Sequence, residues 1–312
     1  MKNHPLSMDI LRGCHHIEQR GEGQFLQRCP QSVCELYKED HNRMIRLQSP
    51  AGIRIVFKTD STSVKLHFSY GRASREIYAF SVFCDGKTVE PVMEHCLLSL
   101  DLDGKMHTLE ILVPHLVECY FRGIDLDDDA VLETVPAPEK RLLFVGDSIM
   151  QGMTTSQPAF TYADKFARAA GADFFNASIA GITAEPEWAK LIADEYDYDT
   201  VLICLGINDY ARGKRLADYT RDLTDFVAAF RNKKMVLISM LHALNQKDEN
   251  AAGEPLQAFR DAVRTLAKSR PDTTFVDGLT LAPAEEQYFI DQLHPNDLGA
   301  ETVFENLKKA LL

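Results

Sequence analysis

The chain has 312 residues, of which 45% are hydrophobic and 26% charged, and this composition is typical of a soluble globular protein with room for two domains. The formal net charge of the whole chain is −12, and both halves are acidic, which argues against a nucleic-acid partner. No apolar run is long enough to span a bilayer and the start of the chain has no secretory signal, so we expect a cytoplasmic location and no membrane partner.

The seven cysteines are odd in number and irregularly spaced, which argues against a disulfide framework. The segment Cys14-His15-His16, followed by Cys29 and Cys34, contains residue types that bind metals. Its spacing matches no common zinc pattern. The sequence therefore predicts reduced cysteines, no metal and no cofactor.

From about residue 43 to residue 134 the hydrophobic pattern has a period of two, as in Ile53, Ile55 and Phe57. One apolar face per strand is typical of sheets that cover a core on one side. Several short strands in succession predict a jelly-roll-like β-sandwich. Residues 1–40 are ambiguous: they add a strand around Phe25-Leu26 or wrap the edge of the sandwich.

Two Asp-Gly pairs lie between these strands, Asp85-Gly86 and Asp103-Gly104. Asp-Gly favours the tight turns of β-hairpins, so a hairpin is expected at each pair. At Val135-Pro136-Ala137-Pro138 the two prolines keep the chain extended. The sequence thus predicts a β-sandwich domain over 1–135, a linker over 136–140 and a second domain over 141–312.

The second domain alternates strands with helices. Apolar runs predict strands at 142–145, 174–178, 200–205, 235–240 and 274–276. Helical patterns fall between and after them, at 161–170, 185–196, 216–230, 255–269 and 298–311. Strands that are apolar on both faces and alternate with helices indicate a parallel sheet with helices on both sides. Ligands of such sheets bind beyond the carboxyl ends of the strands.

Four segments near those strand ends carry chemistry: Gly146-Asp147-Ser148, Gly181, Gly206-Ile207-Asn208-Asp209, and Asp291-Gln292-Leu293-His294-Pro295. Each alone is compatible with an ordinary turn or helix cap. Three of them follow successive strands, so they meet at one edge of the sheet. Pro295 disfavours helix at His294, and a turn there can bring the Asp291 carboxylate to Nδ1 of the imidazole. Nε2 is then free to take a proton from Ser148.

Together the four segments resemble the four blocks of the SGNH hydrolases, also called GDSL esterases, over residues 141–312. The resemblance implies that Ser148 is the nucleophile, that His294 is the general base and then the general acid, and that Asp291 orients His294. It also implies an oxyanion hole made by the Ser148 and Gly181 backbone N–H groups and the Asn208 side chain. Asp147 and Asp209 belong to the blocks without being the triad acid.

A β-sandwich ahead of such a domain resembles two-domain bacterial carbohydrate acetylesterases, and also a few SGNH acyltransferases. The resemblance implies a serine esterase that hydrolyses short-chain, acetyl, esters on a small molecule or oligosaccharide through an acyl-enzyme on Ser148. The alternatives are an acyltransferase with the same triad and a non-catalytic sugar-binding protein. The natural ester and the oligomeric state are not predicted.

Two aromatic residues follow the blocks and are candidates for stacking on a sugar ring, Trp188 and Tyr210. For Trp188, packing in the core of an amphipathic helix is the favoured alternative. The polar stretch 242–250 is either a flap over the site or a surface loop.

Overall fold

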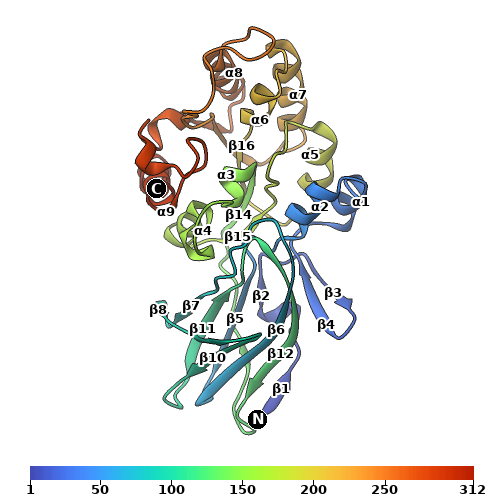
Figure 1. The fold of residues 1–312 in the computed structure, drawn as a ribbon, viewed down its shortest axis with the longest axis vertical. Coiled ribbons are helices and arrows are strands. Elements are labelled where there is room, and N and C mark those ends of the chain that lie inside the picture. The colour runs from blue at the N-terminus through green and yellow to red at the C-terminus, as the bar shows by residue number, and fades with distance from the viewer.

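The computed structural model describes all 312 residues and contains two antiparallel sheets and one parallel sheet. Figure 1 shows the antiparallel sheets at the N-terminal end of the molecule and the parallel sheet, with most helices, at the other. The mixed α/β class and the order of the two parts agree with the prediction from the sequence.

The first antiparallel sheet has the order β3-β4-β12-β6-β10-β9, and β1 pairs with β12. Its strands are β1 (Lys2–His4), β3 (His16–Arg20), β4 (Gly23–Gln27), β6 (Ser63–Ala73), β9 (Val92–Glu94), β10 (Leu97–Asp101) and β12 (Val117–Leu126). The second sheet has the order β13-β5-β11-β7-β8, and β2 pairs with β5. Its strands are β2 (Leu11–Arg12), β5 (Arg54–Thr59), β7 (Ser81–Cys84), β8 (Lys87–Val89), β11 (His107–Leu112) and β13 (Glu133–Thr134).

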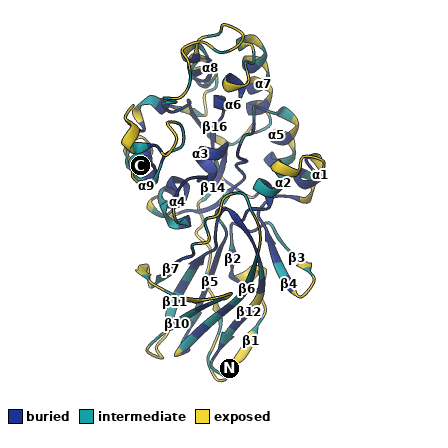
Figure 2. Cartoon of the chain, viewed as in Figure 1, coloured by how far each residue is buried: buried dark blue, intermediate teal, exposed yellow.

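The two antiparallel sheets form a sandwich, because their inward faces share one core. Phe57 and Leu109 from one sheet pack in the same cluster as Leu66, Phe68 and Phe121 from the other, and all five are buried. Figure 2 shows buried residues along these strands and exposed ones in the connecting loops. The period of two in the sequence is the alternation between these faces.

One of the two expected hairpins is present. Asp85 and Gly86, both at positive φ (49° and 75°), join the paired strands β7 and β8. At Asp103-Gly104 the prediction is wrong, because β10 and β11 belong to different sheets. The turn at Asp103-Gly104 connects β10 to β11 and so takes the chain from one sheet of the sandwich to the other.

Between β4 and β5 the chain forms two helices that the sequence pattern did not predict, α1 (Gln31–Leu36) and α2 (His41–Gln48). The expected strand at Phe25-Leu26 is present as β4, but the strand pattern does not begin at residue 43. Val33 and Leu47 are buried in the same core as helix α5 (Pro186–Ala193) of the parallel-sheet half. These helices therefore pack against the second half, although they precede most of the first in sequence.

The parallel sheet has the order β15-β14-β16-β17-β18. Its strands are β14 (Arg141–Gly146), β15 (Asp173–Asn176), β16 (Thr200–Cys204), β17 (Lys234–Ile238) and β18 (Thr273–Val276). The helices are α3 (Ser148–Gln151), α4 (Tyr162–Ala169), α5 (Pro186–Ala193), α6 (Ile207–Ala211), α7 (Leu216–Ala228), α8 (Leu256–Lys268) and α9 (Asp297–Leu311).

Helices cover both faces of this sheet, as predicted. Leu143 and Val145 of β14 point into a core shared with α5, α7 and α8. Leu142 and Phe144, their neighbours on the opposite face, pack in a core shared with α4 and α9. Full burial of both faces explains why these strands are apolar throughout. No helix of the structure has the length and apolar character needed to cross a membrane.

Candidate active site

Ser148 lies at the first residue of α3, directly beyond the end of β14. The Asp147 carboxylate caps α3 by accepting a hydrogen bond from the Ile149 N–H at 2.9 Å. Gly146 has no room for a side chain, since a Cβ there would lie 2.7 Å from Cβ of Met150 and 3.0 Å from the Cys204 carbonyl oxygen. The tight junction between strand and helix holds Ser148 at the carboxyl edge of the sheet.

Asp291 and His294 lie in a turn between β18 and α9, as expected from Pro295. The Asp291 carboxylate accepts hydrogen bonds from the backbone N–H groups of His294 (2.8 Å) and Leu293 (3.2 Å). Its Oδ2 also lies 2.8 Å from Nδ1 of His294. Burial raises the pKa of Asp291, but these hydrogen bonds outweigh it and hold the pKa below its usual value.

The structure brings Ser148 and His294 together across 146 residues of chain. Oγ of Ser148 lies 2.8 Å from Nε2 of His294, and Nδ1 of the same ring faces Asp291. This places a hydroxyl, an imidazole and a carboxylate in one hydrogen-bonded row. An imidazole held between a hydroxyl and a carboxylate can take the proton of that hydroxyl.

The Gly181 and Asn208 segments meet the Ser148 segment at the same edge of the sheet. Gly146 pairs with Cys204 of β16, and its carbonyl accepts a hydrogen bond from Ile179 N–H at 3.0 Å. Gly181 has φ of +79°, a conformation that favours glycine. The Asn208 side-chain nitrogen is buried and has no hydrogen-bond partner in the protein. A buried, unpartnered N–H donor at the sheet edge that carries Ser148 is suited to a developing oxyanion.

Two residues that the sequence did not single out hold the Gly181 loop in place. The Gln151 side chain accepts from Ala180 N–H at 2.8 Å and donates to the Arg46 carbonyl at 2.8 Å. The buried Arg28 guanidinium donates to four backbone carbonyls, those of Ser49, Asn176, Arg46 and Ser178. No motif marks either residue, because each acts by binding backbone atoms far away in sequence.

Two acidic residues of the motif blocks are buried. Burial raises the pKa of Asp147 to about 6, and the nearby Asp209 carboxylate acts in the same direction while His294 opposes it. Burial also raises the pKa of Asp209, against the effect of Lys214, whose Nζ lies 2.8 Å away. Asp209 also accepts from Ala184 N–H at 3.1 Å, so it ties the loop after β15 to α6.

The two aromatic candidates for sugar stacking lie in the core, which contradicts a stacking role for both and agrees with the core packing favoured for Trp188. Trp188 is 0% exposed and packs on Phe226 with ring centroids 5.4 Å apart. Tyr210 is 1% exposed, and its ring packs edge-on against Phe259. Neither face is open to a ligand. Both follow a motif block on a helix whose apolar side faces the sheet.

The 242–250 stretch lies beside the candidate site. Leu244 N–H donates to the Gln292 carbonyl at 2.8 Å, and the Asn245 side chain contacts the Asp291 carbonyl at 3.4 Å. This loop therefore supports the turn that carries His294.

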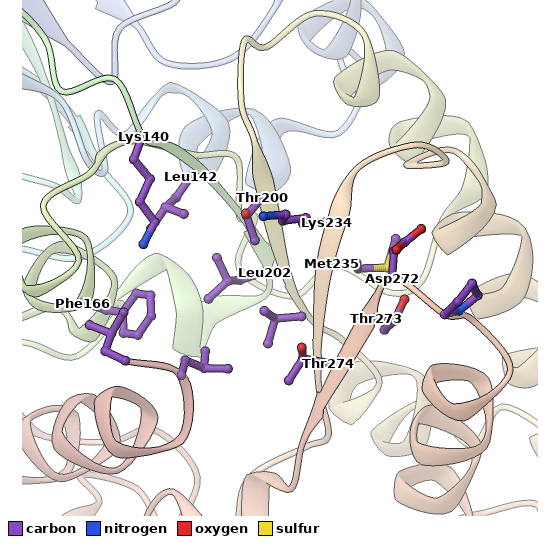
Figure 3. Close-up of a pocket in the computed structure, with 14 residues that line it drawn as sticks. Lys140, Leu142, Phe166, Thr200, Leu202, Lys234, Met235, Asp272, Thr273 and Thr274 are labelled. Carbon is purple, nitrogen blue, oxygen red and sulfur yellow. The ribbon is translucent and has the colours of Figure 1, made fainter.

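A pocket of about 450 Å³ lies elsewhere, between the sheet and the C-terminal helix (Figure 3). Its lining includes Leu142, Thr200, Lys234 and Thr273, which stand at the amino ends of four strands. Ser148 and His294 are at the opposite edge. We assign the candidate site to the carboxyl edge of the sheet, where Ser148 and His294 lie, and not to this pocket.

The structure brings together one group of potential metal ligands, Cys84, Asp85 and His107. His107 is already bonded to two carboxylates, since Nδ1 and Nε2 lie 2.7 Å from Asp85 and Asp103. Hydrogen bonds to Asp85 and then to Asp103 raise the pKa of His107, as in an ion-pair network. The cluster is explained without a metal and lies in the sandwich.

Comparison with known proteins agrees with the geometry at Ser148. Residues 144–302, about half of the chain, match the model of the GDSL-like lipase/acylhydrolase family. The chain belongs to this family. It is therefore an enzyme that hydrolyses ester bonds, and the matched range includes Ser148, Gly181, Asn208, Asp291 and His294. No curated protein matched the sequence.

Solved structures share the fold over both halves. A salicylyl-acyltransferase from a tetracycline biosynthetic pathway has a TM-score of 0.86 at 21% identity, covering 96% of this chain and 93% of its own. A family two carbohydrate esterase from Clostridium thermocellum, solved with cellohexaose, has a TM-score of 0.66 at 16% identity (83% and 91%). An acetyl xylan esterase from Butyrivibrio proteoclasticus has a TM-score of 0.64 at 14% identity (98% and 95%).

Proposed function

We propose that the protein is a serine esterase that cleaves short-chain acyl esters of carbohydrate alcohols through an acyl-enzyme on Ser148. The observation that carries the proposal is the row formed by Ser148, His294 and Asp291, with 2.8 Å between Oγ and Nε2 and 2.8 Å between Nδ1 and Oδ2. Asn208 adds a buried donor without a partner.

The row of side chains accounts for each proton. Oγ of Ser148 attacks the ester carbonyl carbon while Nε2 of His294 takes the hydroxyl proton, and the charge of Asp291 stabilises the imidazolium. The carbonyl oxygen, now negative, accepts from Asn208 and from the Ser148 and Gly181 N–H groups. The C–O bond to the alcohol breaks as His294 returns the proton to the leaving oxygen. Water, deprotonated by His294, then cleaves the Ser148 ester and releases the acid.

A short acyl group, acetyl, is supported by the fold that the chain shares with an acetyl xylan esterase. The carbohydrate alcohol is supported by the fold shared with two carbohydrate esterases.

The direct test is hydrolysis of 4-nitrophenyl acetate by the purified chain and by Ser148→Ala. We expect turnover by the wild type and a loss of about 10⁴-fold or more in the variant. Circular dichroism checks that the variant is folded. Equal turnover by the two proteins would remove Ser148 from the mechanism, and no turnover by the wild type would contradict the esterase proposal.

An acyltransferase is the second candidate, because the fold of the salicylyl-acyltransferase covers almost the whole chain. The two activities share the acyl-enzyme and differ in which nucleophile attacks it. Adding a sugar alcohol to the assay separates them. Acyl-sugar formation at the expense of free acid identifies a transferase, whereas unchanged release of acid identifies a hydrolase.

A further inference from the structure

Two arginines without a carboxylate partner, Arg46 from α2 and Arg212 directly after α6, bind carbonyls of the Gly181 loop. A third, Arg75 from the segment after β6, is near enough to Arg46 to affect its charge. None of the three takes part in an ion pair within the chain, whereas their neighbour Arg43 is paired with Asp40 and Glu185. The protein as a whole has a net charge of −12, so unpaired positive charge concentrated at one place stands out.

The guanidinium groups of Arg46 and Arg212 lie against the proposed oxyanion donor. Nη1 of Arg46 donates to the Ala180 carbonyl at 3.0 Å, and Nη2 of Arg212 donates to the Gly181 carbonyl at 2.7 Å. A Cβ placed on Gly181 would lie 2.8 Å from Nη1 of Arg46 and 4.0 Å from Nη2 of Arg212. Both cations therefore border the space immediately beside Gly181, next to the Ser148 site.

The arginines are close enough to affect one another. Burial lowers the pKa of Arg46, and the charges of Arg212, Arg43 and Arg75 lower it further against the effect of Asp40. Bringing like charges together costs free energy unless an anion offsets them. Each guanidinium binds one loop carbonyl and keeps further N–H donors, which suit the oxygens of a carboxylate, sulfate or phosphate.

We infer that the ester substrate carries an anionic group close to its carbonyl, bound by Arg46 and Arg212. The inference rests on the proposed esterase function and specifies its substrate class. The site is built from both halves of the molecule, since Arg46 precedes the parallel sheet and Arg212 belongs to it. The antiparallel half thus contributes to substrate choice at a nucleophile supplied by the parallel half.

The test compares matched esters with and without a charge. On the acyl side, mono-4-nitrophenyl succinate is compared with 4-nitrophenyl pentanoate. On the alcohol side, acetylated methyl glucuronoside is compared with acetylated methyl glucoside. We expect kcat/KM to favour the anionic member of one pair by about tenfold or more, and the pair that responds locates the charge. Added salt should weaken the preference, because it screens partly exposed charges.

Variants separate anion binding from support of the loop. Arg46→Gln and Arg212→Gln keep a side-chain amide donor but lose the charge, and each should reduce the anionic-to-neutral ratio of kcat/KM by about tenfold. The matched control is Arg221→Gln, an exposed arginine of α7 paired with Asp218, which should leave the ratio unchanged. If Arg46→Gln and Arg212→Gln lower both rates equally, the arginines only hold the loop and the inference fails.

Binding to the Ser148→Ala protein gives a readout that does not depend on turnover. Calorimetry should show tighter binding of acetylated methyl glucuronoside or mono-4-nitrophenyl succinate than of its neutral counterpart. If the wild type does not hydrolyse 4-nitrophenyl acetate, the esterase proposal fails while this preference still supports an anion site. Equal binding within both pairs, with equal rates, overturns the anion site and leaves the esterase proposal intact.

Discussion

The parallel and antiparallel halves of the molecule contribute to the candidate site in different ways. In the parallel sheet every strand ends at the same edge, so the segments after β14, β15 and β16 converge there. In the sandwich, neighbouring strands run in opposite directions and their ends are divided between two rims. The sandwich half reaches the site by another route, through α1 and α2 between β4 and β5.

The difference shows in the kind of residue each half supplies. The parallel half provides the reacting groups Ser148 and His294, which are 2.8 Å apart. The other half provides cations that bind backbone, such as Arg28 and Arg46. The carboxyl edge of a parallel sheet is suited to catalysis because it brings several loops together. The helices α1 and α2 that pack against it are suited to supporting those loops and to selecting the substrate.

The largest effect expected in the parallel half is at the carboxylate of the row. Asp291→Asn keeps the shape but removes the charge that stabilises the imidazolium, so kcat for 4-nitrophenyl acetate should fall about 10⁴-fold. Asp277→Asn is a control, since Asp277 also follows a strand but pairs with Arg264. A loss of less than about tenfold would remove Asp291 from the mechanism.

The contribution of the sandwich half is tested at Arg28. Arg28→Leu removes four hydrogen bonds to backbone carbonyls and leaves the buried Asn176 and Ser178 carbonyls without this donor, so it should lower the free energy of unfolding by about 3 to 5 kcal/mol. Urea denaturation measures the change, with the exposed Arg221→Leu as control.

We propose that residues 136–140 are the linker between two domains. We expect the whole chain to unfold in one transition, because α1 and α2 bridge the domains. Two separate urea transitions, of which Arg28→Leu shifts only the first, would show that the two halves unfold independently.

At the oxyanion position the expected effect is smaller. Asn208→Ala removes one donor and should slow turnover by about 10² to 10³-fold, with little change in stability because the side-chain nitrogen has no partner in the protein. Steady-state kinetics and a thermal melt measure the two quantities. Unchanged turnover would exclude Asn208 from the oxyanion hole.

The smallest effect concerns pH and the buried Asp147. Its pKa is about 6 in the folded chain and 3.8 when unperturbed. Below the lower value both states are protonated. Between 3.8 and about 6 the unfolded chain gives up this proton while the folded chain keeps it, so wild-type stability falls across that range and is level above it. Asp147→Asn keeps the acceptor for Ile149 N–H and should gain roughly 2 to 3 kcal/mol over the wild type at pH 7, but nothing near pH 4. A difference in the free energy of unfolding between Asp147→Asn and the wild type that is the same at pH 4 and pH 7 would contradict this prediction.

The hydrophobic pattern of the sequence was sufficient to predict strands and helices where it was long and repeated. Each strand and helix expected after residue 141 is present, with ends shifted by a few residues. The Asp85-Gly86 hairpin is also present, because a two-residue turn between paired strands is decided locally. At Asp103-Gly104 the same residues join two sheets, since no local interaction decides which layer the next strand enters.

The sequence by itself determined the order of strands and helices after residue 141, the glycines at tight turns, and the serine and histidine whose types suit acyl transfer, because these depend on residues close together in the chain. Only the tertiary structure decided that Trp188 is buried, that α2 packs beside the parallel sheet, and that Arg46 and Arg212 meet at Gly181. Such contacts join residues that are distant in the chain, 31 positions apart for Arg212 and Gly181 and 134 for Arg46 and Ala180, and they leave no periodic pattern in the sequence.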